Sequence, residues 1–584
     1  MSDKYAECFI DWLVEEGYTT CFFVAGGNTM HLLAAARSRV NCIPVVHEVT
    51  AAIAAEYFNE HSDTDRAFAL VTAGPGLTNA VTGIAGAWLE SRELLVVGGQ
   101  VKSSDLTSGD LRQRGIQEIK GVELVSSITK ASVLIDKPLS KSEVISYCSL
   151  SREPRRGPVF LEMCLDVQGM PYAERAPEVK TESVTLLTIC DEELTRLHDE
   201  LESASRPVLL LGGGLDRAST WAIREQLNHM RIPIMTSWNG ADRFASDNDM
   251  WFGRPDTWGM RFSNLLIQQA DLVVSLGARL SMQQTGFNWK EFVPNGRVVQ
   301  VDIDTAETTK GHPKVDWVLN VDANDLIRRL SVSTKGNCEQ WISHCRKVRQ
   351  ALPLNDPFNV TGSGFISPYE FAEKLSDICD SATAVVPCSS GGANTVMMQS
   401  FLNKSGQIFF NNKALASMGY GLAGAIGAAV SNPNKRVVLV EGDGGFTQNS
   451  QDLATLRAQN LNIKIFIFSN EGYASIRMTQ RNYFDGEYIG CDVRSGLGFP
   501  DWEKLADAYG LQFRKVTMAS LRQLGNNDSW LDNKPVLFLV DIDPEQTYFP
   551  KITSRVAADG QMESAPLHLM SPDLGEQLQQ ELYL

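Results

Sequence analysis

Residues 436–470, RVVLVEGDGGFTQNSQDLATLRAQNLNIKIFIFSN, place a glycine-rich segment between two apolar runs. RVVLVEGDGG predicts a buried strand that leads into a glycine turn, and NIKIFIFSN predicts a second strand. QNSQDLATLRAQN between them predicts a helix with Leu453 and Leu456 on one face. Such a unit has parallel strands joined by a right-handed crossover. The carboxyl ends of both strands therefore lie at one edge of a sheet, where open α/β sheets bind ligands.

A cation site is expected at this edge. Asp443 and Asn470 follow the two strands, so they should lie close together although 26 residues separate them. Mg²⁺ prefers near-octahedral oxygen ligands, usually one or two carboxylates with phosphate and water. Asp443 offers a carboxylate, Asn470 an amide oxygen, and the backbone near Gly472 a carbonyl. Three glycines would let the backbone approach a phosphate: Gly442, Gly444 and Gly445. The alternative is an ordinary tight turn with a solvated aspartate.

Composition narrows the class of protein. The chain has 584 residues, enough for three or four domains, and a formal net charge of −17, which disfavours a nucleic-acid-binding surface. It shows no run of about 18 apolar residues and no signal peptide, so a cytoplasmic protein without a membrane partner is expected. Eleven cysteines are scattered without a CxxC pair, which predicts reduced thiols and no zinc site.

Short apolar strands alternate with helical runs along the whole chain, which predicts an α/β protein of three doubly wound parallel-sheet domains. The predicted boundaries are 1–175, 190–345 and 366–545, with a weakly patterned tail, 546–584, that packs across other domains. Two irregular stretches separate the domains: GMPYAERAPEVKTES at 169–183 and LPLNDPFNVTGSGFISP at 352–368.

The GDG segment followed about 25 residues later by asparagine resembles the diphosphate–Mg²⁺ motif of thiamine-diphosphate enzymes. VVHEVTAA resembles the family's catalytic-glutamate segment, TAGPGLTNA its GPG loop, and ASMGYGLAGAIGA its aminopyrimidine-binding segment. VVSLGARL and VVQVDID are similar to the FAD-binding domain of the acetohydroxyacid (acetolactate) synthase branch. The chain is thus identified as a member of this family over roughly residues 4–575. The resemblance implies pyrimidine-binding, central FAD-type and diphosphate-binding domains, in that order.

The resemblance also implies roles for single residues. Glu48 would hydrogen-bond N1′ of the thiamine aminopyrimidine, and Met418 would be the apolar wedge that bends the cofactor. The diphosphate would be bound by Ser389, Ser390 and Gly391. The cavity over the reacting carbon would be lined by Gly76, Asn79 and Gln117, with Asn28 and His31 as further candidates. The alternatives are a helix-capping acid, a core methionine, a plain Ser-Gly turn and a packed histidine.

FAD contacts are implied in the central domain, where the flavin of the synthase branch is structural and has no net redox turnover. The implied contacts are Gly212, Gly213, Gly214, Arg279, Asp302, Asp304 and Asp322. The alternative is a domain that keeps this fold without a flavin, as in some family members.

The chain departs from biosynthetic acetohydroxyacid synthases at two positions. Those enzymes carry Phe-Gln where this chain has Ile116-Gln117, and a tryptophan where it has Arg481. That tryptophan would pack on the ethyl group of 2-ketobutyrate, whereas a guanidinium suits phosphate or carboxylate. Gln117 and Arg481 are therefore the candidate substrate contacts. The alternative is that Arg481 points to solvent.

The expected activity is decarboxylation of pyruvate, or another 2-keto acid, and ligation of the two-carbon unit to a ketone or aldehyde. CFFVAGGNTMHLL and the tail resemble carboligases that act on a nucleotide-linked keto-deoxysugar in yersiniose-type branched-sugar synthesis. The alternatives are acetolactate synthase, a cyclohexane-1,2-dione hydrolase or simple decarboxylase, a flavin-dependent pyruvate oxidase, and a non-catalytic scaffold. The family implies a homodimer or homotetramer, with Glu48 of one chain facing Asp443 and Asn470 of another.

Overall fold

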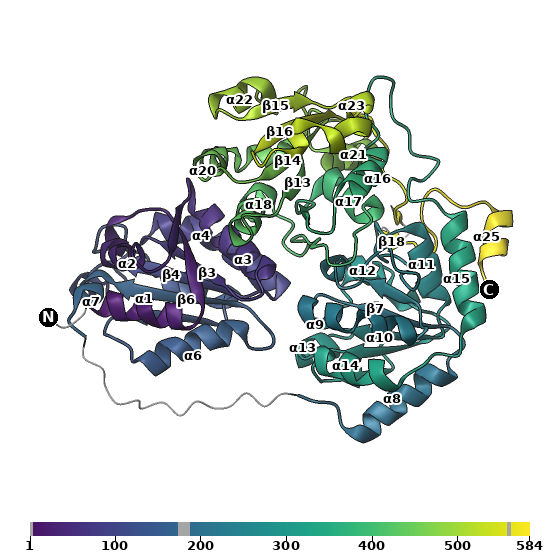
Figure 1. The fold of residues 1–584 in the computed structure, drawn as a ribbon, viewed down its shortest axis with the longest axis horizontal. Coiled ribbons are helices and arrows are strands. Elements are labelled where there is room, and N and C mark those ends of the chain that lie inside the picture. Colours follow the sequence, from purple (N-terminus) through teal and green to yellow (C-terminus); the bar gives the residue numbers. More distant parts are fainter. Residues whose placement is uncertain (1–3, 173–186, 557–561) are drawn as a thin grey trace.

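The computed structural model describes residues 4–172, 187–556 and 562–584. Three separate parallel sheets form three α/β domains, which confirms the predicted fold class. In Figure 1 the N-terminal domain lies at the left, the C-terminal domain at the top and the central domain at the lower right. Most of the predicted linker, residues 173–183, lies outside the described residues. Among those described, no helix has the length and apolarity needed to cross a bilayer.

The N-terminal sheet has the strand order β2-β1-β3-β4-β6-β5. Its strands are β1 Tyr18–Phe23, β2 Asn41–Pro44, β3 Arg66–Val71, β4 Leu94–Gln100, β5 Ala131–Ile135 and β6 Pro158–Cys164. The helices are α1 Tyr5–Glu15, α2 Met30–Ala36, α3 Glu48–His61, α4 Pro75–Glu90, α5 Gly121–Val125, α6 Lys141–Arg152 and α7 Leu165–Gly169.

The central sheet has the order β11-β10-β9-β7-β8. Its strands are β7 Pro207–Leu211, β8 Ile234–Thr236, β9 Leu272–Leu276, β10 Arg297–Val301 and β11 Trp317–Leu319. The helices are α8 Asp191–Ser203, α9 Arg217–Ala222, α10 Arg224–His229, α11 Arg261–Gln269, α12 Met282–Thr285, α13 Thr305–Thr309, α14 Ala323–Ser333 and α15 Glu339–Ala351.

The C-terminal sheet has the order β12-β13-β14-β16-β15. Its strands are β12 Ala384–Val386, β13 Val437–Gly442, β14 Ile463–Ser469, β15 Gln512–Lys515 and β16 Val536–Asp541. The helices are α16 Pro368–Ile378, α17 Gly391–Ser400, α18 Tyr420–Ser431, α19 Asp443–Thr447, α20 Leu453–Ala458, α21 Ala474–Tyr483, α22 Trp502–Ala508, α23 Met518–Gln523 and α24 Asp528–Leu531.

The residues after β13 differ from the prediction of a glycine turn. Helix α19 begins directly at Asp443, and the Asp443 carboxylate accepts a hydrogen bond from the N–H of Gly444 at 2.7 Å. The N-cap residue of this helix is Gly442, so no side chain caps it. The helix predicted over 448–460 is shorter than expected, with a 3₁₀ turn at Ser450–Asp452 followed by α20.

Small residues join the N- and C-terminal domains through α3 and α18, which lie side by side in Figure 1. A Cβ on Gly427 would lie 2.1 Å from the carbonyl oxygen of Ala54, and one on Gly424 would lie 2.6 Å from the Tyr57 ring. Alanine and glycine at these positions let the two helices approach closely. Their side chains belong to one buried apolar cluster that spans both domains.

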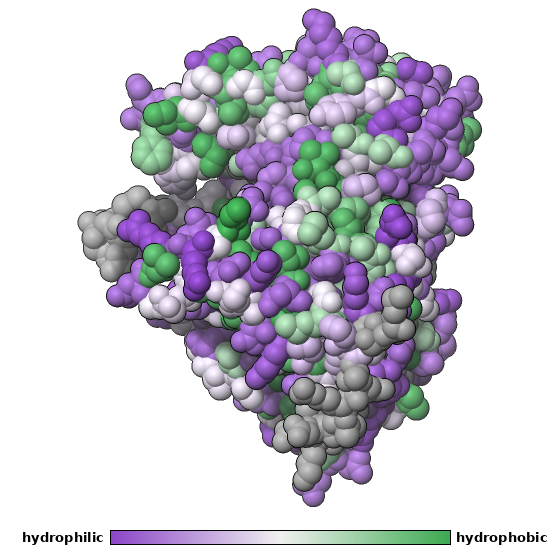
Figure 2. Space-filling model, turned by 90° about the vertical axis from the view of Figure 1, so that its left-hand side faces the viewer, coloured by the Kyte–Doolittle hydropathy of each residue, from purple (hydrophilic) through white to green (hydrophobic). Residues whose placement is uncertain are grey.

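The C-terminal tail returns to the central domain, where α25 (Glu576–Leu582) lies near α15 (Figure 1). Leu567 and Leu582 are buried in the central core. An antiparallel hairpin precedes them, with strands β17 Ser554–Val556 and β18 Met562–Ser564. The face of the molecule in Figure 2 is mostly hydrophilic, with hydrophobic residues singly or in small groups, as is usual for a protein surface.

Candidate active site

Asp443 and Asn470 lie side by side at the carboxyl ends of β13 and β14, as predicted. The two strands are parallel neighbours, and the Asn470 N–H donates to Asp443 Oδ2 at 2.9 Å. Gly472 must be glycine because a Cβ there would lie 2.2 Å from the carbonyl oxygen of Cys491. The backbone of residues 470–472 is therefore held close to the Asp443 carboxylate.

The pair formed by Asp443 and Asn470, here called the cation corner, has the chemistry that a hard cation prefers. Asp443 is 1% exposed, and burial raises the pKa of its carboxyl group to about 6. No basic side chain of the described residues forms an ion pair with it, and no cluster of three metal-ligating side chains occurs among them. One carboxylate, an amide oxygen and a backbone carbonyl would leave the other positions of a Mg²⁺ ion to phosphate and water.

The loops beside this corner leave room for a phosphate. A Cβ on Gly442 or Gly391 would meet nothing within 4 Å, and Gly391 has a φ of +77°, which favours glycine. Ser390 precedes α17 at the N-cap position, and its side chain does not cap the helix. Free backbone N–H groups at such a helix start are suited to an anion.

Gly444 and Gly445 instead make room for side chains of their own domain. A Cβ on Gly444 would lie 2.2 Å from the ring of Tyr473, and one on Gly445 would lie 2.9 Å from a carboxylate oxygen of Glu441. These two glycines therefore allow close packing beneath the corner, whereas Gly442 faces open space.

The segment that carries Met418 is hydrogen-bonded to Ser389 before α17 and to Asn449 after α19. The hydroxyl of Ser389 donates to the carbonyl of Ser417, and Asn449 Nδ2 donates to the carbonyl of Gly419 at 2.8 Å. Gln448 Nε2 lies 3.7 Å from the Met418 sulfur. Met418 is half-buried, so it presents an apolar surface beside the cation corner and is not a fully packed core residue.

Glu48 is the first residue of α3 and is 8% exposed. The Nδ2 group of Asn79 donates to Glu48 Oε2 at 2.9 Å. No described basic side chain forms an ion pair with Glu48. Burying a carboxylate with one amide partner is costly, so the position is typical of an acid reserved for a ligand.

The GPG loop packs against the backbone of Gln117. Gly74 has a φ of +63°, and a Cβ on it would lie 2.3 Å from the carbonyl oxygen of Gln117. Gly76 is buried against Thr72, whereas Gln117 is exposed and Ile116 is 86% exposed. This side of the site is therefore open in a single chain.

His31 lies in the first turn of α2, and Asn28 lies in the 3₁₀ turn that precedes this helix. The carbonyl of Asn28 accepts a hydrogen bond from Gln168 Nε2 at 2.7 Å, while Asn28 Nδ2 is buried without a partner. His31 is half-buried, and a Cβ on Gly169 would lie 3.2 Å from its Nε2. His31 is thus packed against α7.

A cavity of about 560 Å³ lies between the N-terminal and central domains. Of the residues implied as FAD contacts, those that line it are Gly213, Gly214, Arg279, Asp302 and Asp322. Burial raises the pKa of Asp302 to about 6, and Asp302 Oδ1 accepts from the N–H of Asp304 at 3.0 Å. Arg279 Nη1 donates to the carbonyl of Leu89 at 2.6 Å.

Gly212 and Asp304 have structural roles near this cavity. A Cβ on Gly212 would lie 2.2 Å from the carbonyl oxygen of Gly277. The lack of a side chain at Gly212 therefore allows the ends of β7 and β9 to lie close together. Asp304 caps α13 and pairs with Arg155 at 2.5 Å.

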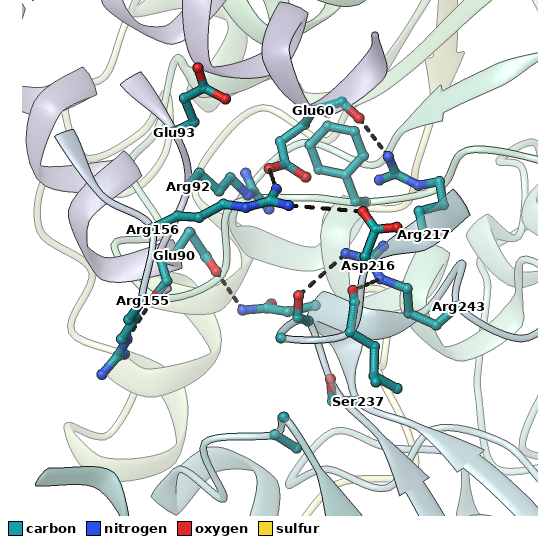
Figure 3. A pocket seen from close by; sticks show the side chains of 18 of the residues that line it. Glu60, Glu90, Arg92, Glu93, Arg155, Arg156, Asp216, Arg217, Ser237 and Arg243 are labelled. Atoms are coloured by element: carbon teal, nitrogen blue, oxygen red, sulfur yellow. Dashed lines mark hydrogen bonds and ion pairs between the residues drawn. The ribbon is translucent and has the colours of Figure 1, made fainter. Parts of the chain in front are cut away.

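Arginines on the cavity wall were not predicted. Arg156 reaches between the carboxylates of Glu60 and Asp216, each 3.8 Å away, while Arg217 and Arg243 converge from the central domain (Figure 3). The Arg156 side chain is 47% exposed, so these loose ion pairs leave it free to bind an anion. The sequence signal would have been the RR pair before β6.

Arg481 lies on α21, directly after the cation corner. Its Nη1 pairs with Glu545 Oε2 at 2.5 Å, and both side chains are substantially exposed. Such a surface ion pair contributes only about 0–1 kcal/mol, so the guanidinium can exchange Glu545 for another anion.

Asp452 was also missed. It is fully buried at the start of α20, and its carboxylate accepts from Val46 N at 3.2 Å and from Thr50 Oγ1 at 2.5 Å. These two partners flank Glu48, so a residue of the C-terminal domain fixes the turn that carries it. No local pattern marks this contact, because more than 400 residues separate the partners.

The chain matches three models of one family over most of its length. Residues 3–124 match "Thiamine pyrophosphate enzyme, N-terminal TPP binding domain", residues 194–330 its central domain, and residues 390–537 its C-terminal TPP binding domain. The first and last of these carry the Glu48 and Asp443 corners.

Similar proteins align over nearly the full chain. The acetolactate synthase large subunit of Porphyra purpurea is 28% identical over 92% of this chain and 90% of its own length. The isozyme 2 large subunit of Escherichia coli K12 is 27% identical over 94% and 97%, respectively. A probable acetolactate synthase large subunit of Methanocaldococcus jannaschii is 28% identical over 93% and 92%. With its three matching domains, the chain belongs to the thiamine pyrophosphate (thiamine diphosphate) enzyme family, in its acetolactate synthase-like branch of carboligases.

Proposed function

We propose that this protein transfers the two-carbon unit of pyruvate to a ketone or aldehyde with Mg²⁺ and thiamine diphosphate. The observation that carries the proposal is the pair of prepared corners. One holds the buried Glu48 with only Asn79 as its amide partner, and the other holds Asp443 with Asn470 beside open glycine loops. Burying a carboxylate without a basic partner costs stability, and a scaffold protein would gain nothing from either of these two sites in return.

Some of the site residues would bind the cofactor and its metal ion, and others would take part in the reaction. Asp443, Asn470 and the Gly472 carbonyl would bind Mg²⁺, while Ser389, Ser390 and Gly391 would contact the diphosphate. Glu48 would exchange a proton with the aminopyrimidine, in the orientation that Asn79 fixes. Thiamine diphosphate, when bound, supplies the nucleophilic carbon that stabilises charge while pyruvate loses CO₂. Gln117 and Met418 would shield this carbon from water.

The identity of the acceptor substrate is less constrained by the site residues than the identity of the donor. Arg481 offers a guanidinium where the synthases carry tryptophan, and its only ion-pair partner among the described residues is the exposed Glu545. We favour an acceptor that carries phosphate, such as a nucleotide-linked keto-deoxysugar, over 2-ketobutyrate, whose only charged group is a carboxylate. Acetolactate synthase is the second candidate, because relatives with that name align over nearly the whole chain.

FAD is the proposed occupant of the interdomain cavity. Its lining supplies a glycine loop at Gly213, a buried carboxylate at Asp302 and a loosely paired guanidinium at Arg156, groups that suit a dinucleotide. We assign the flavin no net redox turnover, so pyruvate should not bleach it.

A homo-oligomer would complete the site. Ile116 and Val46, which adjoin Gln117 and Glu48, are 86% and 49% exposed in the single chain. A second copy that covers them would bring its Asp443 corner toward Glu48 and exclude water from the reaction.

The test is to supply the purified protein with Mg²⁺, thiamine diphosphate and pyruvate, and to measure CO₂ and products with and without added ketones. A tertiary alcohol formed only with ketone supports the proposal. Acetolactate as the sole product would favour the second candidate. No CO₂ from pyruvate would refute both, and a carbon–carbon bond hydrolase would then be tested with cyclohexane-1,2-dione.

A further inference from the structure

Lys551, in the tail, is a cation without a carboxylate partner among the described residues. Its Nζ lies 3.0 Å from the sulfur of Met478 and is 5.5 Å from the ring centroid of Trp258 and 5.7 Å from that of Phe549. Aromatic rings and a thioether stabilise an ammonium group only weakly compared with a carboxylate. The half-buried ammonium therefore keeps capacity for an anion.

Arg481 brings a second cation to the same place. Met478 and Arg481 are three residues apart on α21, so they share a face of that helix. Burial lowers the pKa of the Lys551 ammonium group, and the charge of Arg481 lowers it further. Lys551 contacts Met478 and therefore lies beside the face of α21 that carries Arg481. Two cations on one face repel each other, and an anion bound between them would remove this repulsion.

Both segments are anchored to the cation corner. Arg477 Nη2, one helical turn before Arg481, donates to the carbonyl of Asn470 at 2.9 Å. In the tail, a Cβ on Gly392 would lie 2.8 Å from the ring of Tyr548, three residues before Lys551. An anion held by Lys551 and Arg481 would therefore sit beside the loops that bind Mg²⁺ and diphosphate.

We propose that Lys551 and Arg481 together bind the phosphate group of an anionic carbonyl acceptor. This proposal rests on the proposed function, because it assigns the acceptor half of the same site. Two converging cations match the charge of a phosphate dianion, whereas one arginine alone already suffices for a carboxylate. The side chain of Lys551 contributes a point charge and that of Arg481 a planar fork.

Glu545 competes with other anions for Arg481 when no acceptor is bound. Its carboxylate pairs with Arg481, but it is 62% exposed and can turn to solvent. Phosphate binding then replaces one weak surface ion pair with two charge-assisted contacts. Removing the Glu545 carboxylate should strengthen phosphate binding, which is opposite in sign to removing either cation.

The first test measures inorganic phosphate binding by calorimetry to protein already saturated with Mg²⁺ and thiamine diphosphate, so that the diphosphate site is filled. K551M and R481M should each weaken binding by about tenfold, and E545Q should strengthen it by about threefold. K504M, at a lysine on α22 whose side chain is 85% exposed, is the matched control and should bind as wild type does. Equal affinities in all five proteins would overturn the proposal. The Arg481 side chain is 37% exposed and makes only a surface ion pair, so R481M gives a result even if K551M does not fold.

The second test compares dihydroxyacetone phosphate with dihydroxyacetone as acceptors. K551M and R481M should raise the KM for dihydroxyacetone phosphate about tenfold more than they raise the KM for dihydroxyacetone. A raised KM for 2-ketobutyrate but not for dihydroxyacetone phosphate would overturn the phosphate assignment. If no protein releases CO₂, the proposed function fails, while the phosphate-binding measurement still decides on the cation pair.

Discussion

Asp452 tests whether the C-terminal domain positions Glu48, the proposed catalytic acid. The D452A substitution removes two hydrogen bonds that reach across the domain boundary, to Val46 N and to Thr50 Oγ1. Bonds to a charged acceptor contribute about 1.5–3 kcal/mol each, so the gross loss is about 3–6 kcal/mol. Burial raises the pKa of Asp452, so the carboxylate already costs energy in the folded protein and the net loss is smaller.

We expect a net loss of about 2–4 kcal/mol, because the half-exposed Val46 can bond to water while Thr50, fully buried, cannot. A three-domain chain does not unfold in one step, so a local measurement is needed. Hydrogen exchange followed by mass spectrometry on residues 41–56 should show protection reduced about 30- to 1,000-fold. Carboligation should fall about 10- to 100-fold as Glu48 loses its orientation.

The T455V variant is the matched control. Thr455 donates to Asp452 Oδ1 at 3.0 Å within the same domain, so its loss leaves both contacts across the boundary in place. Exchange of residues 41–56 should then match wild type. The reasoning is refuted if D452A changes exchange only within 453–458 and leaves 41–56 unchanged.

Four other substitutions probe the rest of the site. E48Q should lower carboligation by about 10²–10⁴-fold while cofactor affinity, measured by fluorescence titration, changes little, because Asn79 can still donate to the amide oxygen. D443N should weaken Mg²⁺ binding by at least about 100-fold in a metal titration. Burial raises the pKa of Asp302 from 3.8 to about 6, so the contribution of this group to stability is greatest below pH 3.8 and is lost as the pH rises through 6. D302N lacks this loss, so without flavin its advantage in Tm should grow between pH 4 and 6 and then stay constant. I116D should shift sedimentation toward the single chain, and an unchanged assembly would argue against an interface at this 86% exposed residue.

Local patterns were sufficient for most strands of the three sheets and for the closeness of Asp443 and Asn470. Buried strands such as β13 and β14 are continuous apolar runs, and their parallel pairing follows from the connection between them. That pairing brings Asp443 to Asn470, so their closeness could be predicted without knowing the rest of the fold. Strands β5, β11 and β15 were not predicted, because they are short or only partly buried and their sequences lack a strong pattern.

Contacts between domains could not be predicted in the same way. Asp452 and Arg155 each look like ordinary charged residues in their own segments, yet one fixes the turn before Glu48 and the other captures Asp304. Which polar side chain meets which partner depends on how whole domains dock. The family resemblance supplied roles for Glu48 and Met418, but it could not show that Asn79 is the amide that orients Glu48.

The close packing of α3 and α18 has a mechanical consequence for the proposed assembly. Glu48 begins α3 and Gly419 precedes α18, while Gly424 and Gly427 allow no space between the two helices. Movement at one helix start is therefore transmitted to the other through a dense interface. In an assembly whose sites lie between chains, each chain would supply Glu48 to one site and the Met418 segment to another. Binding of cofactor at one site would then change the geometry of the next site through the closely packed helices α3 and α18.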